Sequence, residues 1–368
     1  MTVLAAAAAI LWLAILLLPW RPWRADLALD AKPSQSPLGN VTALIPARNE
    51  APVLPETLAA LKAQGGALAI VVVDDQSSDA TAEVARSRGA HVIAGAPVPS
   101  GWTGKVWALE QGRALLASEY VLLLDADIAL APGTVAALLG KVQREGLAFA
   151  SLVPQPRFEG FWEKLLMPAF VYFFALLYPF RLSNAPASRI TAASGGCVLA
   201  ERRVLDAIGG FGALKGALID DCALAACVKR AGFRTWIGLT HSARSLRPYP
   251  RLADIRSMVE RTAYTQLRYS PLWLALCTAA LALAFWIPVV AIAAPDVWVR
   301  TYGVAAFAGM FASYVPTLRY YGRSSGWGFA LPVIGTLYLA MTWCSALRYY
   351  RCERARWKDR VYVRESTG

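Results

Sequence analysis

Two pairs of carboxylates follow short apolar stretches of the sequence. Asp74 and Asp75 come directly after one stretch, and Asp125 and Asp127 follow another in the pattern Asp-Ala-Asp. Carboxylate oxygens are hard ligands that suit Mg²⁺ or Mn²⁺, and a cation that bridges a diphosphate needs few protein ligands because the phosphates supply the rest. A pair of carboxylates at a turn is also common in a solvated loop, so the strands before them decide how much the pattern means.

The elements that would position these carboxylates alternate between strands and helices. Three short runs have the length and aliphatic content of buried strands: Val41–Pro46, Ala69–Val73 and Tyr120–Leu124. Helical patterns accompany them at Val53–Gln64, Ala80–Arg88 and Val106–Ala117. This alternation predicts an α/β fold with an open, mostly parallel sheet, in which ligands bind beyond the carboxyl ends of the strands. Each predicted strand ends in polar residues, so we expect a binding site at that edge.

Missing motifs exclude several common chemistries. No Gly-x-Gly-x-x-Gly follows the first strand and no Gly-x-x-x-x-Gly-Lys-Ser/Thr occurs, which disfavours NAD enzymes and P-loop ATPases. The 6 cysteines lack Cys-x-x-Cys spacing and there are only 2 histidines, so a structural zinc site is not expected. We interpret the cysteines as small buried side chains in a reducing compartment.

Charged residues at the starts of predicted helices form a second candidate group. Lys105 follows a glycine-containing loop, where a cation and a helix N-terminus can approach a diphosphate; an ordinary surface lysine is the alternative. Asp220 and Asp221 stand directly before the helical pattern Cys222–Ala231. The alternative to a functional role is that this pair of carboxylates only caps the helix. We interpret Asp79 as the N-cap of the helix that follows it.

Composition and charge favour a membrane protein over a purely soluble enzyme. The chain is 57% hydrophobic, against about 45–50% for soluble globular proteins, and its net charge is +12. A positive charge of this size suits an anionic membrane surface. The uncharged run Val3–Trp20 is followed by Arg21 and Arg24, so we expect an uncleaved anchor whose C-terminal end is cytoplasmic. A buried core helix is the alternative for this run.

Near the C-terminal end, the number of uncharged stretches conflicts with the charge of the segment that follows them. They are Leu272–Ala294, Thr301–Leu318 and Ser324–Leu347, and the basic segment 348–368 follows them. If all three crossed a membrane, this segment would lie outside, whereas its basic residues predict a cytoplasmic location. One stretch is therefore expected to be re-entrant or interfacial, and Thr301–Leu318, the shortest, is the candidate.

A further apolar stretch, Leu165–Phe180, is too short to span a membrane comfortably. We expect an interfacial helix there, with an ordinary core helix as the alternative. The predicted organisation is an N-terminal anchor (1–24), an α/β domain (39–249), a basic juxtamembrane segment (250–271), C-terminal membrane segments (272–347) and a basic cytoplasmic tail (348–368).

Several short segments resemble the successive signatures of a known family. Ile45–Glu50, Val73–Asp79 and Leu124–Asp127 resemble those of family 2 glycosyltransferases with the GT-A fold. Ala193–Cys197, Leu218–Leu224 and Glu260–Arg268 are similar to segments of the membrane-bound, ceramide-glucosyltransferase-like branch. From the first anchor to the tail, their order and spacing most resemble the hopene-associated glycosyltransferases of bacterial hopanoid biosynthesis.

The resemblance implies roles on the donor side of the site. Asp74 or Asp75 would contact the base of the donor nucleotide, and the same pocket would be lined by Arg48, Asn49 and Glu50. A carboxylate that accepts a hydrogen bond from a pyrimidine N3–H is chemically sensible. For Arg48, a salt bridge to Glu50 or Asp75 is the alternative.

The resemblance also implies a metal site and a base. Asp127 would bind a divalent cation, Mn²⁺ or Mg²⁺, directly, and Asp125 would hold the ribose or a metal-bound water. Asp221 would be the general base that takes the proton of the acceptor, although the residue before it departs from the glutamate that the family usually carries. Gly195 and Gly196 would form the floor near the transferred sugar, with a simple loop turn as the alternative.

The sequence departs from the family where a Gln-x-x-Arg-Trp motif usually clamps the donor diphosphate. Aligned on Arg261, the segment lacks both the glutamine and the tryptophan. Arg261 is the candidate clamp, and Gln266 and Arg268 are the alternatives. The missing tryptophan also argues against a processive polymer synthase, which stacks the growing glycan on that ring.

Arginines crowd the stretch before the C-terminal membrane segments. We expect most of them to face anionic lipid headgroups. They are Arg244, Arg247, Arg251, Arg256, Arg261 and Arg268.

The resemblance implies an inverting, metal-dependent transferase of the bacterial inner membrane. It would move a sugar from a nucleotide-sugar, a UDP-sugar in the first instance, to a lipid hydroxyl at the cytoplasmic leaflet, with a hopanoid as the expected acceptor. Ceramide, a carotenoid or polyprenyl phosphate are alternative acceptors, and a non-catalytic membrane scaffold is the alternative from another class. Nucleic-acid binding is disfavoured because the basic residues cluster beside membrane segments.

Overall fold

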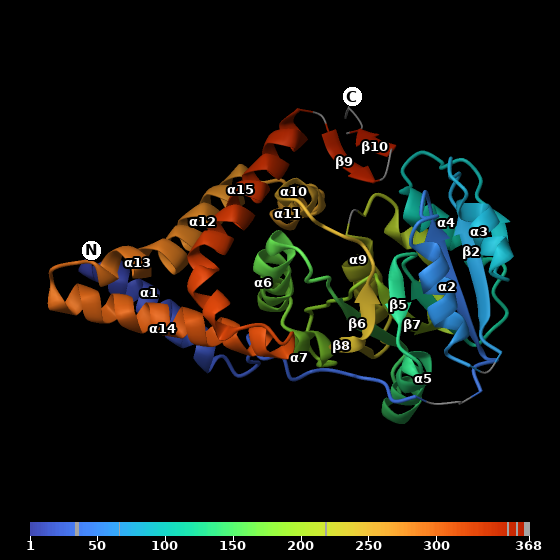
Figure 1. Ribbon diagram of the computed structural model, residues 1–368, viewed down its shortest axis with the longest axis horizontal. Coiled ribbons are helices and arrows are strands. Elements are labelled where there is room, and N and C mark those ends of the chain that lie inside the picture. Colours follow the sequence, from blue (N-terminus) through green and yellow to red (C-terminus); the bar gives the residue numbers. More distant parts are fainter. Residues whose placement is uncertain (34–36, 66, 218, 352, 358–359, 364–368) are drawn as a thin grey trace. The chain divides into compact units, whose positions relative to one another are not determined.

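The computed structural model of the chain describes residues 1–368 except 34–36, 66, 218, 352, 358–359 and 364–368. The chain forms two compact units, which are described separately (Figure 1). The α/β unit comprises Leu27–Arg157 and Phe180–Pro248, and the helical unit comprises Met1–Asp26, Phe158–Pro179 and Tyr249–Gly368. The predicted domain boundaries at 39 and 249 remain a prediction, and residues 158–179, inside that predicted domain, group with the helical unit.

A sheet of eight strands forms the centre of the α/β unit, in the order β3-β2-β1-β4-β7-β6-β8-β5. β1 pairs in parallel with β2 and β4, β2 with β3, and β6 with β8, whereas β7 and β5 run antiparallel to their neighbours. This mostly parallel sheet confirms the predicted fold class. The strands are Val41–Ala47 (β1), Ala69–Asp74 (β2), His91–Ala94 (β3), Tyr120–Leu124 (β4), Ile128–Leu130 (β5), Phe149–Gln155 (β6), Cys197–Glu201 (β7) and Thr235–Ser245 (β8).

Helices cover both faces of this sheet. They are Leu54–Lys62 (α2), Thr81–Ser87 (α3), Gly104–Arg113 (α4), Thr134–Glu145 (α5), Phe180–Asn184 (α7), Arg202–Ala207 (α8), Gly210–Leu214 (η1) and Asp220–Arg230 (α9). Successive residues of β1 enter different apolar clusters: Ile45 packs with residues of α2 and α5, and Leu44 packs with residues of α4 and α9. Strands that are buried on both faces have continuous apolar sequences, which explains why their pattern was easy to predict.

The three predicted strands and the three predicted helices of this unit are confirmed, with shifts at their ends. β1 and β2 are each one residue longer than predicted, and β4 has the predicted bounds. α4 begins two residues before the predicted start, so Lys105 lies in its first turn, and it ends at Arg113 instead of Ala117.

The helical unit consists of long apolar helices and shorter connecting ones. They are Thr2–Leu17 (α1), Phe161–Leu177 (α6), Leu252–Glu260 (α10), Ala263–Gln266 (α11), Pro271–Leu281 (α12), Ala282–Trp286 (η2, a π-helical turn), Ile287–Ile292 (α13), Val297–Tyr320 (α14), Ser325–Ala330 (η3) and Leu331–Tyr350 (α15), followed by the hairpin strands Glu353–Trp357 (β9) and Arg360–Val363 (β10). In the described part of the chain, Pro271–Ile292 and Ser325–Tyr350 are long and apolar enough to span a membrane.

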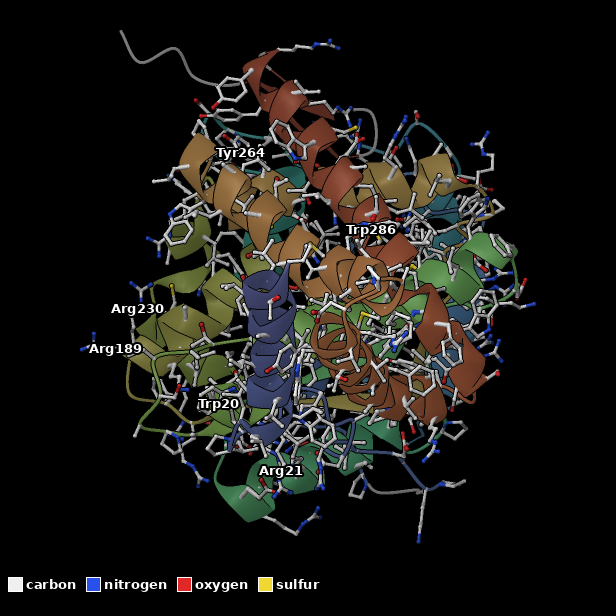
Figure 2. All side chains as sticks on the ribbon, turned by 90° about the vertical axis from the view of Figure 1, so that its left-hand side faces the viewer. Trp20, Arg21, Arg189, Arg230, Tyr264 and Trp286 are labelled. Carbon is white, nitrogen blue, oxygen red and sulfur yellow. The ribbon has the colours of Figure 1, made fainter. Side chains whose placement is uncertain are left out.

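One contact explains how α1 joins the helix run that contains the π-helical turn. Pro288 has no N–H group to donate to the carbonyl oxygen of Ala284, four residues earlier. The Nε1–H of Trp12 donates to this oxygen instead, at 2.8 Å, and Trp12 is almost fully buried. Figure 2 shows α1 from the side on which the chain begins, with Trp20 and Arg21 just beyond its other end.

α6, the predicted interfacial helix, is buried or partly buried over most of its length. Leu166, Ala169 and Tyr172 lie in the core of the helical unit. Phe161 and Leu177, at the two ends of the helix, are mostly exposed. The interfacial location of this helix remains a prediction.

Candidate active site

The sheet edge brings the polar strand ends together, as predicted. β1, β2 and β4 are parallel neighbours, so the loops after them leave from one edge. The N–H of Asp75 donates to the carbonyl oxygen of Ala47 at 2.8 Å. Arg48 Nη1 donates to the carbonyl oxygens of Asp75 at 2.6 Å and Gln76 at 2.9 Å. Arg48 therefore ties the first two loops together through backbone oxygens.

Asn49 fixes the same two loops from the other side. Its φ is +51°, a left-handed conformation that asparagine tolerates better than most residues. Its backbone N–H donates to Ser77 Oγ at 3.0 Å, and its Oδ1 accepts from the N–H of Ser78 at 2.8 Å. Asp74 Oδ1 accepts from the N–H of Ser77 at 3.4 Å, and Asp75 is fully buried. The predicted nucleotide pocket is thus built from mutually bonded loops.

Asp79 supports the start of α3 from one residue before the N-cap, so its interpretation as the N-cap itself is wrong by one position. Its Oδ1 accepts from the N–H of Thr81 at 3.0 Å, and its Oδ2 accepts from the N–H of Ala51 at 3.2 Å. Ala80 occupies the N-cap position itself. The carboxylate therefore satisfies an open helix-end donor and joins α3 to the loop after β1.

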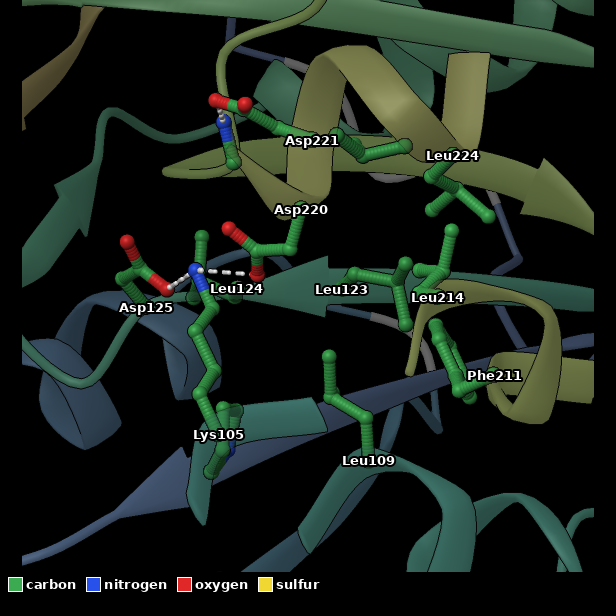
Figure 3. Close-up of a pocket in the computed structure, with 13 residues that line it drawn as sticks. Lys105, Leu109, Leu123, Leu124, Asp125, Phe211, Leu214, Asp220, Asp221 and Leu224 are labelled. Carbon is green, nitrogen blue, oxygen red and sulfur yellow. Dashed lines mark hydrogen bonds and ion pairs between the residues drawn. The ribbon is translucent and has the colours of Figure 1, made fainter. Parts of the chain in front are cut away.

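Lys105 lies between two of the predicted carboxylates (Figure 3). Its Nζ is 2.7 Å from Asp125 Oδ1 and 3.8 Å from Asp220 Oδ2. Burial lowers the pKa of Lys105, but the charges of Asp125 and Asp220 outweigh burial and raise it, so the ammonium stays protonated. Burial also raises the pKa of Asp125, and the charge of Lys105 opposes that shift. The alternative of an ordinary surface lysine is therefore wrong.

Asp221 is held by two backbone N–H groups. Its Oδ2 accepts from Gly195 at 2.9 Å and its Oδ1 accepts from Cys222 at 2.7 Å. Burial and the charge of Asp220 raise the pKa of Asp221 to about 6, although Lys105 and the two backbone donors lower it. A carboxylate with this pKa is mostly ionised at pH 7 and accepts a proton more readily than an ordinary aspartate.

A small pocket opens between these charged groups (Figure 3). Its charged lining residues are Lys105, Asp125, Asp220 and Asp221. Its remaining walls are mostly apolar: Pro46, Leu109, Leu123, Leu124, Val198, Phe211, Leu214 and Leu224. The apolar walls strengthen the electrostatic interactions of the charged groups because they exclude water from one side.

Arg247 connects two carboxylates on another part of the edge. Its Nε is 2.6 Å from Asp127 Oδ2, and its Nη2 is 2.8 Å from Glu50 Oε1. The backbone holds the same register, because the N–H of Leu246 donates to the carbonyl oxygen of Asp127 at 2.8 Å. Both carboxylates are largely buried. Arg247 is a site residue that the sequence analysis placed in a lipid-facing stretch; it lies two residues after the end of β8, a strand that was not predicted.

The charge balance of the edge fits a divalent cation that arrives with a diphosphate. Five carboxylates face two cations; the carboxylates are Glu50, Asp125, Asp127, Asp220 and Asp221, and the cations are Lys105 and Arg247. This excess of negative charge would repel a diphosphate alone. Among the described residues no three His, Cys, Asp or Glu side chains form a metal-binding group. The oxygen donors of Asp125 and Asp127 fit the predicted cation.

Two glycines allow close packing beneath the pocket. A Cβ atom at Gly195 would lie 3.1 Å from Lys105 Nζ, and one at Gly196 would lie 2.8 Å from Pro154 Cγ. The groups that approach these glycines are protein side chains, and their predicted place near the transferred sugar remains a prediction. Cys222 lies beside this loop as a buried thiol whose pKa is raised by burial, which agrees with the interpretation of the cysteines as inert side chains.

The candidates for the diphosphate clamp belong to the helical unit. Arg261 follows α10 as its C-cap, and Gln266 Oε1 accepts from the hydroxyl of Tyr178 at 2.6 Å. Arg268 has a φ of +53° in the turn before α12. The predicted role of these three residues remains a prediction.

That most arginines of the basic stretch face lipid headgroups remains a prediction, but two of them pair with carboxylates of the α/β unit. Arg244 pairs with Glu56, and Arg247 pairs as described above, both within the α/β unit. Arg244 lies in β8, one residue before its end, and Arg247 lies two residues after its end. In the helical unit, Arg251 pairs with Asp254 at 3.0 Å and Arg256 with Glu260 at 3.2 Å.

Comparison with known families agrees with this geometry. Residues 42–209 match the sequence model of Glycosyl transferase family 2. The matched range contains β1, β2 and β4 with the loops that follow them, as well as Lys105, Gly195 and Gly196. It ends before Asp221 and Arg247.

Relatives of known function match a shorter part of the chain. The 4,4'-diaponeurosporenoate glycosyltransferase of Staphylococcus haemolyticus is 36% identical over 106 residues, which is 28% of each chain. That of Staphylococcus aureus (strain USA300) is 34% identical over 108 residues, 29% of each chain. The matches thus span less than a third of the length of these curated relatives.

One solved structure has the same fold over nearly the whole chain. It is the mannosyltransferase PcManGT from Pyrobaculum calidifontis, solved in complex with GDP-Man and Mn²⁺. The superposition has a TM-score of 0.52 and 20% sequence identity, and it covers 93% of this chain and 99% of the other.

Proposed function

We propose that the chain is an inverting transferase that acts on a membrane lipid, because residues 42–209 match the sequence model of Glycosyl transferase family 2. It takes the sugar of a nucleotide-sugar, a UDP-sugar in the first instance, and joins it to a lipid hydroxyl. The observation that carries the proposal is one partly buried carboxylate, Asp221, held by two backbone donors in the same pocket as the Lys105–Asp125 pair.

The proposed chemistry is a single displacement assisted by Asp221. The acceptor hydroxyl oxygen forms a bond to the anomeric carbon while the Asp221 carboxylate takes the hydroxyl proton. The bond from the anomeric carbon to the phosphate oxygen breaks, and the nucleoside diphosphate leaves with that electron pair. One displacement inverts the configuration at the carbon. With a pKa of about 6, the base is ionised in roughly ten of eleven molecules at pH 7.

The loops after β1 and β2 are proposed to bind the nucleotide. Asp74 or Asp75 would accept a hydrogen bond from the base, within the loops that Arg48 and Asn49 hold together. The ammonium of Lys105 would attract the diphosphate. A divalent cation, Mn²⁺ or Mg²⁺, held by Asp125 and Asp127 would neutralise charge on the leaving diphosphate.

Two lines support a lipid acceptor. The Staphylococcus relatives are named for 4,4'-diaponeurosporenoate, a carotenoid-type lipid. The helical unit exposes large apolar side chains, among them Ile10, Trp273, Val304 and Phe329. A hopanoid is the acceptor that the sequence resemblance favours, and a carotenoid is the second candidate, which the relatives favour. The exposed apolar surface is proposed to lie in the bacterial inner membrane with the α/β unit on the cytoplasmic side.

The test is donor binding followed by transfer, on the full chain purified in detergent. UDP, GDP, CMP and their sugars are titrated by calorimetry with and without Mn²⁺ or Mg²⁺, on the wild type and on Asp127→Ala. Radiolabelled sugar from the donor that binds is then offered with hydroxylated hopanoids and carotenoids. Asp221→Asn is compared with Glu145→Gln, which changes an exposed carboxylate of α5 that pairs with Lys141.

The proposal expects metal-dependent binding of one nucleotide-sugar, loss of that dependence in Asp127→Ala, and transfer that Asp221→Asn abolishes and Glu145→Gln retains. Folded protein that binds none of the nucleotides would favour the scaffold alternative instead. Equal transfer by Asp221→Asn and the wild type would remove Asp221 as the base.

A further inference from the structure

The helical unit contains a hairpin of two long helices. The continuous run α12–η2–α13 (Pro271–Ile292) is joined to α14 (Val297–Tyr320) by a short turn. Near this turn the helices touch, because a Cβ atom at Gly303 would lie 2.7 Å from that of Ala291. The turn therefore forms one end of the hairpin, and Pro271 and Tyr320 mark the other, which we call the open end. At 1.5 Å per residue, runs of 22 and 24 residues extend about 33 and 36 Å, enough for a hydrocarbon core of about 30 Å.

α1 runs beside α14 in the same direction. Ala5 packs with Val299 near the turn. Further along, a Cβ atom at Gly309 would lie 3.0 Å from that of Trp12. Figure 1 shows the two helices side by side, and Figure 2 shows Trp20 and Arg21 just after α1 ends. α1 therefore also leads from the turn end of the hairpin toward its open end.

The chain after α14 returns only part of the way toward the turn. Phe329 of η3 packs on Phe311, with ring centroids 4.7 Å apart, and on Phe307 at 6.1 Å. These two rings lie about halfway along α14. At the start of α15, a Cβ atom at Gly335 would lie 2.8 Å from the ring of Phe285, inside the other long helix. α15 therefore begins in the middle of the helical bundle and not at the turn.

α15 then leads back to the open end of the hairpin. Its Ser345 Oγ accepts from the N–H of Tyr264 at 3.1 Å. Its Tyr349 ring stacks on Tyr269, just before α12, with centroids 4.4 Å apart and an interplanar angle of 16°. Tyr264, labelled in Figure 2, marks this end of the contact. The segment from Tyr321 to Tyr350 thus starts and finishes at the same end of the bundle.

We propose that α1, α12–α13 and α14 cross the bilayer, whereas η3 and α15 enter and leave through one leaflet. This proposal rests on the membrane location given under the proposed function and specifies which surface contacts which leaflet. The exposed apolar side chains of this segment face the acyl chains of the leaflet at the open end. They are Phe329, Val333, Trp343 and Leu347.

The arginines of the unit identify that leaflet as cytoplasmic. Among the described helix ends, the turn carries Arg300 and the open end carries every other arginine of the crossing and re-entrant segments: Arg21, Arg24, Arg268, Arg319, Arg323, Arg348 and Arg351. Basic residues concentrate on the cytoplasmic side of membrane proteins, where anionic lipids attract them. Three crossings also remove the conflict between the number of apolar stretches and the basic charge of the last segment. With three crossings, the segments after α1 and after α15 lie on the same side of the membrane.

Average hydropathy suggests the opposite assignment for α14 and α15, because it ignores which side chains face lipid. Ser325–Tyr350 passes the composition test for a span and α14 does not. α14, however, directs its small and polar residues inward: Ser313 is fully buried and lies 2.7 Å from the hydroxyl of Tyr172, and Thr317 is 5% exposed. The sequence interpretation of Thr301–Leu318 as the segment that fails to cross is therefore replaced by Ser324–Leu347.

The test is the sidedness of single cysteines in the full chain. Trp298→Cys at the turn, Ser324→Cys before η3 and Arg351→Cys after α15 are each exposed to a membrane-impermeant maleimide in right-side-out and inverted vesicles. Glu145→Cys in the α/β unit marks the cytoplasmic side. Native cysteines that react in the parent chain are first replaced by serine. A second measurement fuses a fluorescent protein or alkaline phosphatase after Gly368, since the first matures only inside and the second only outside.

The expected result is labelling of the cysteines at 145, 324 and 351 in inverted vesicles, labelling at 298 in right-side-out vesicles, and a fluorescent fusion. Labelling at 351 from the side that labels 298, with an active phosphatase fusion, would overturn the proposal because α15 would cross. Labelling at 298 and 324 from one side, or extraction of the chain by carbonate, would overturn both this proposal and the membrane location. Sugar transfer is assayed separately on the same preparations, so the proposed reaction can fail or stand independently.

Discussion

Replacing Asp221 with asparagine separates catalysis from folding in one variant. Asparagine has the same shape as aspartate but cannot take a proton from an acceptor hydroxyl. Loss of a general base typically lowers turnover by about 10²–10⁴-fold, or roughly 2.7–5.4 kcal/mol in the activation free energy. We therefore expect turnover in this range below that of the wild type, with donor binding retained, because the donor-side groups such as Lys105 are unchanged.

The same substitution has a calculable effect on stability. The pKa of Asp221 rises from 3.8 to about 6 on folding, so the ionised form opposes folding by roughly 3 kcal/mol, an upper bound. This penalty is absent well below pH 3.8, where the carboxyl is protonated in both states, grows as the pH rises, and is fully present well above pH 6. Asparagine removes this charge penalty. Its amide NH₂, however, then faces a backbone N–H, and the lost hydrogen bond costs about 1–3 kcal/mol at every pH.

Comparing the stability difference between Asp221→Asn and the wild type at two pH values isolates the charge effect, because the cost of the lost hydrogen bond is the same at both. The thermal midpoint of Asp221→Asn relative to wild type should rise by several degrees between pH 4.5 and pH 8. Scanning fluorimetry of both proteins in detergent, with Glu145→Gln as the control, measures it. A pH-independent difference would refute the assigned burial of charge. Unfolding of Asp221→Asn at pH 8 would assign the carboxylate a structural role and leave the base unidentified.

Three further substitutions test other contacts of the site and its support. Lys105→Met should weaken nucleotide-sugar binding at least tenfold and move the midpoint of the pH–activity profile above 6, because the ammonium lowers the pKa of Asp221. The control Lys62→Met, on α2, should change neither. An unmoved midpoint in Lys105→Met would contradict the electrostatic coupling. Arg247→Gln should tighten Mn²⁺ binding to the nucleotide-free protein, measured by electron paramagnetic resonance, because it releases a carboxylate; unchanged or weaker binding would contradict this competition. Gly112→Ala should destabilise the fold by about 1–3 kcal/mol, since its Cβ would lie 2.3 Å from a leucine methyl of β1. In the control Gly140→Ala, the new Cβ meets only the end of a flexible arginine side chain. Equal melting temperatures of the two variants would refute the packing argument.

The sheet edge was predictable from the sequence because the strands that form it are local and buried on both faces. Val41–Pro46 and Tyr120–Leu124 are continuous apolar runs, which few other structures explain. Their polar ends had to meet once the strands were parallel, so the positions of Asp75 and Asp125 followed from topology alone.

The pairing of charges across the site was not predictable, because it depends on contacts between distant residues. Lys105 and Asp220 are 115 positions apart, and only the packing of α4 and α9 brings their side chains together. Arg247 was hidden for a different reason. It stands in a run of arginines, and composition alone cannot separate the two that pair within the α/β unit, Arg244 and Arg247, from those that do not.

The position of Asp221 reconciles two demands that oppose each other. A base must be ionised at neutral pH, which favours a helix N-terminus, backbone donors and a nearby cation. It must also hold a proton well enough to take one, which favours burial and a neighbouring negative charge. The first turn of α9 supplies the donor of Cys222, Gly195 supplies another, and Lys105 supplies the cation. Burial and Asp220 oppose them, and the resulting pKa of about 6 lies just below neutral pH. A pair of carboxylates that served only to cap the helix would not need the contact of Asp221 with Gly195, so the arrangement favours the proposed role of Asp221 in proton transfer over a role in helix stability alone.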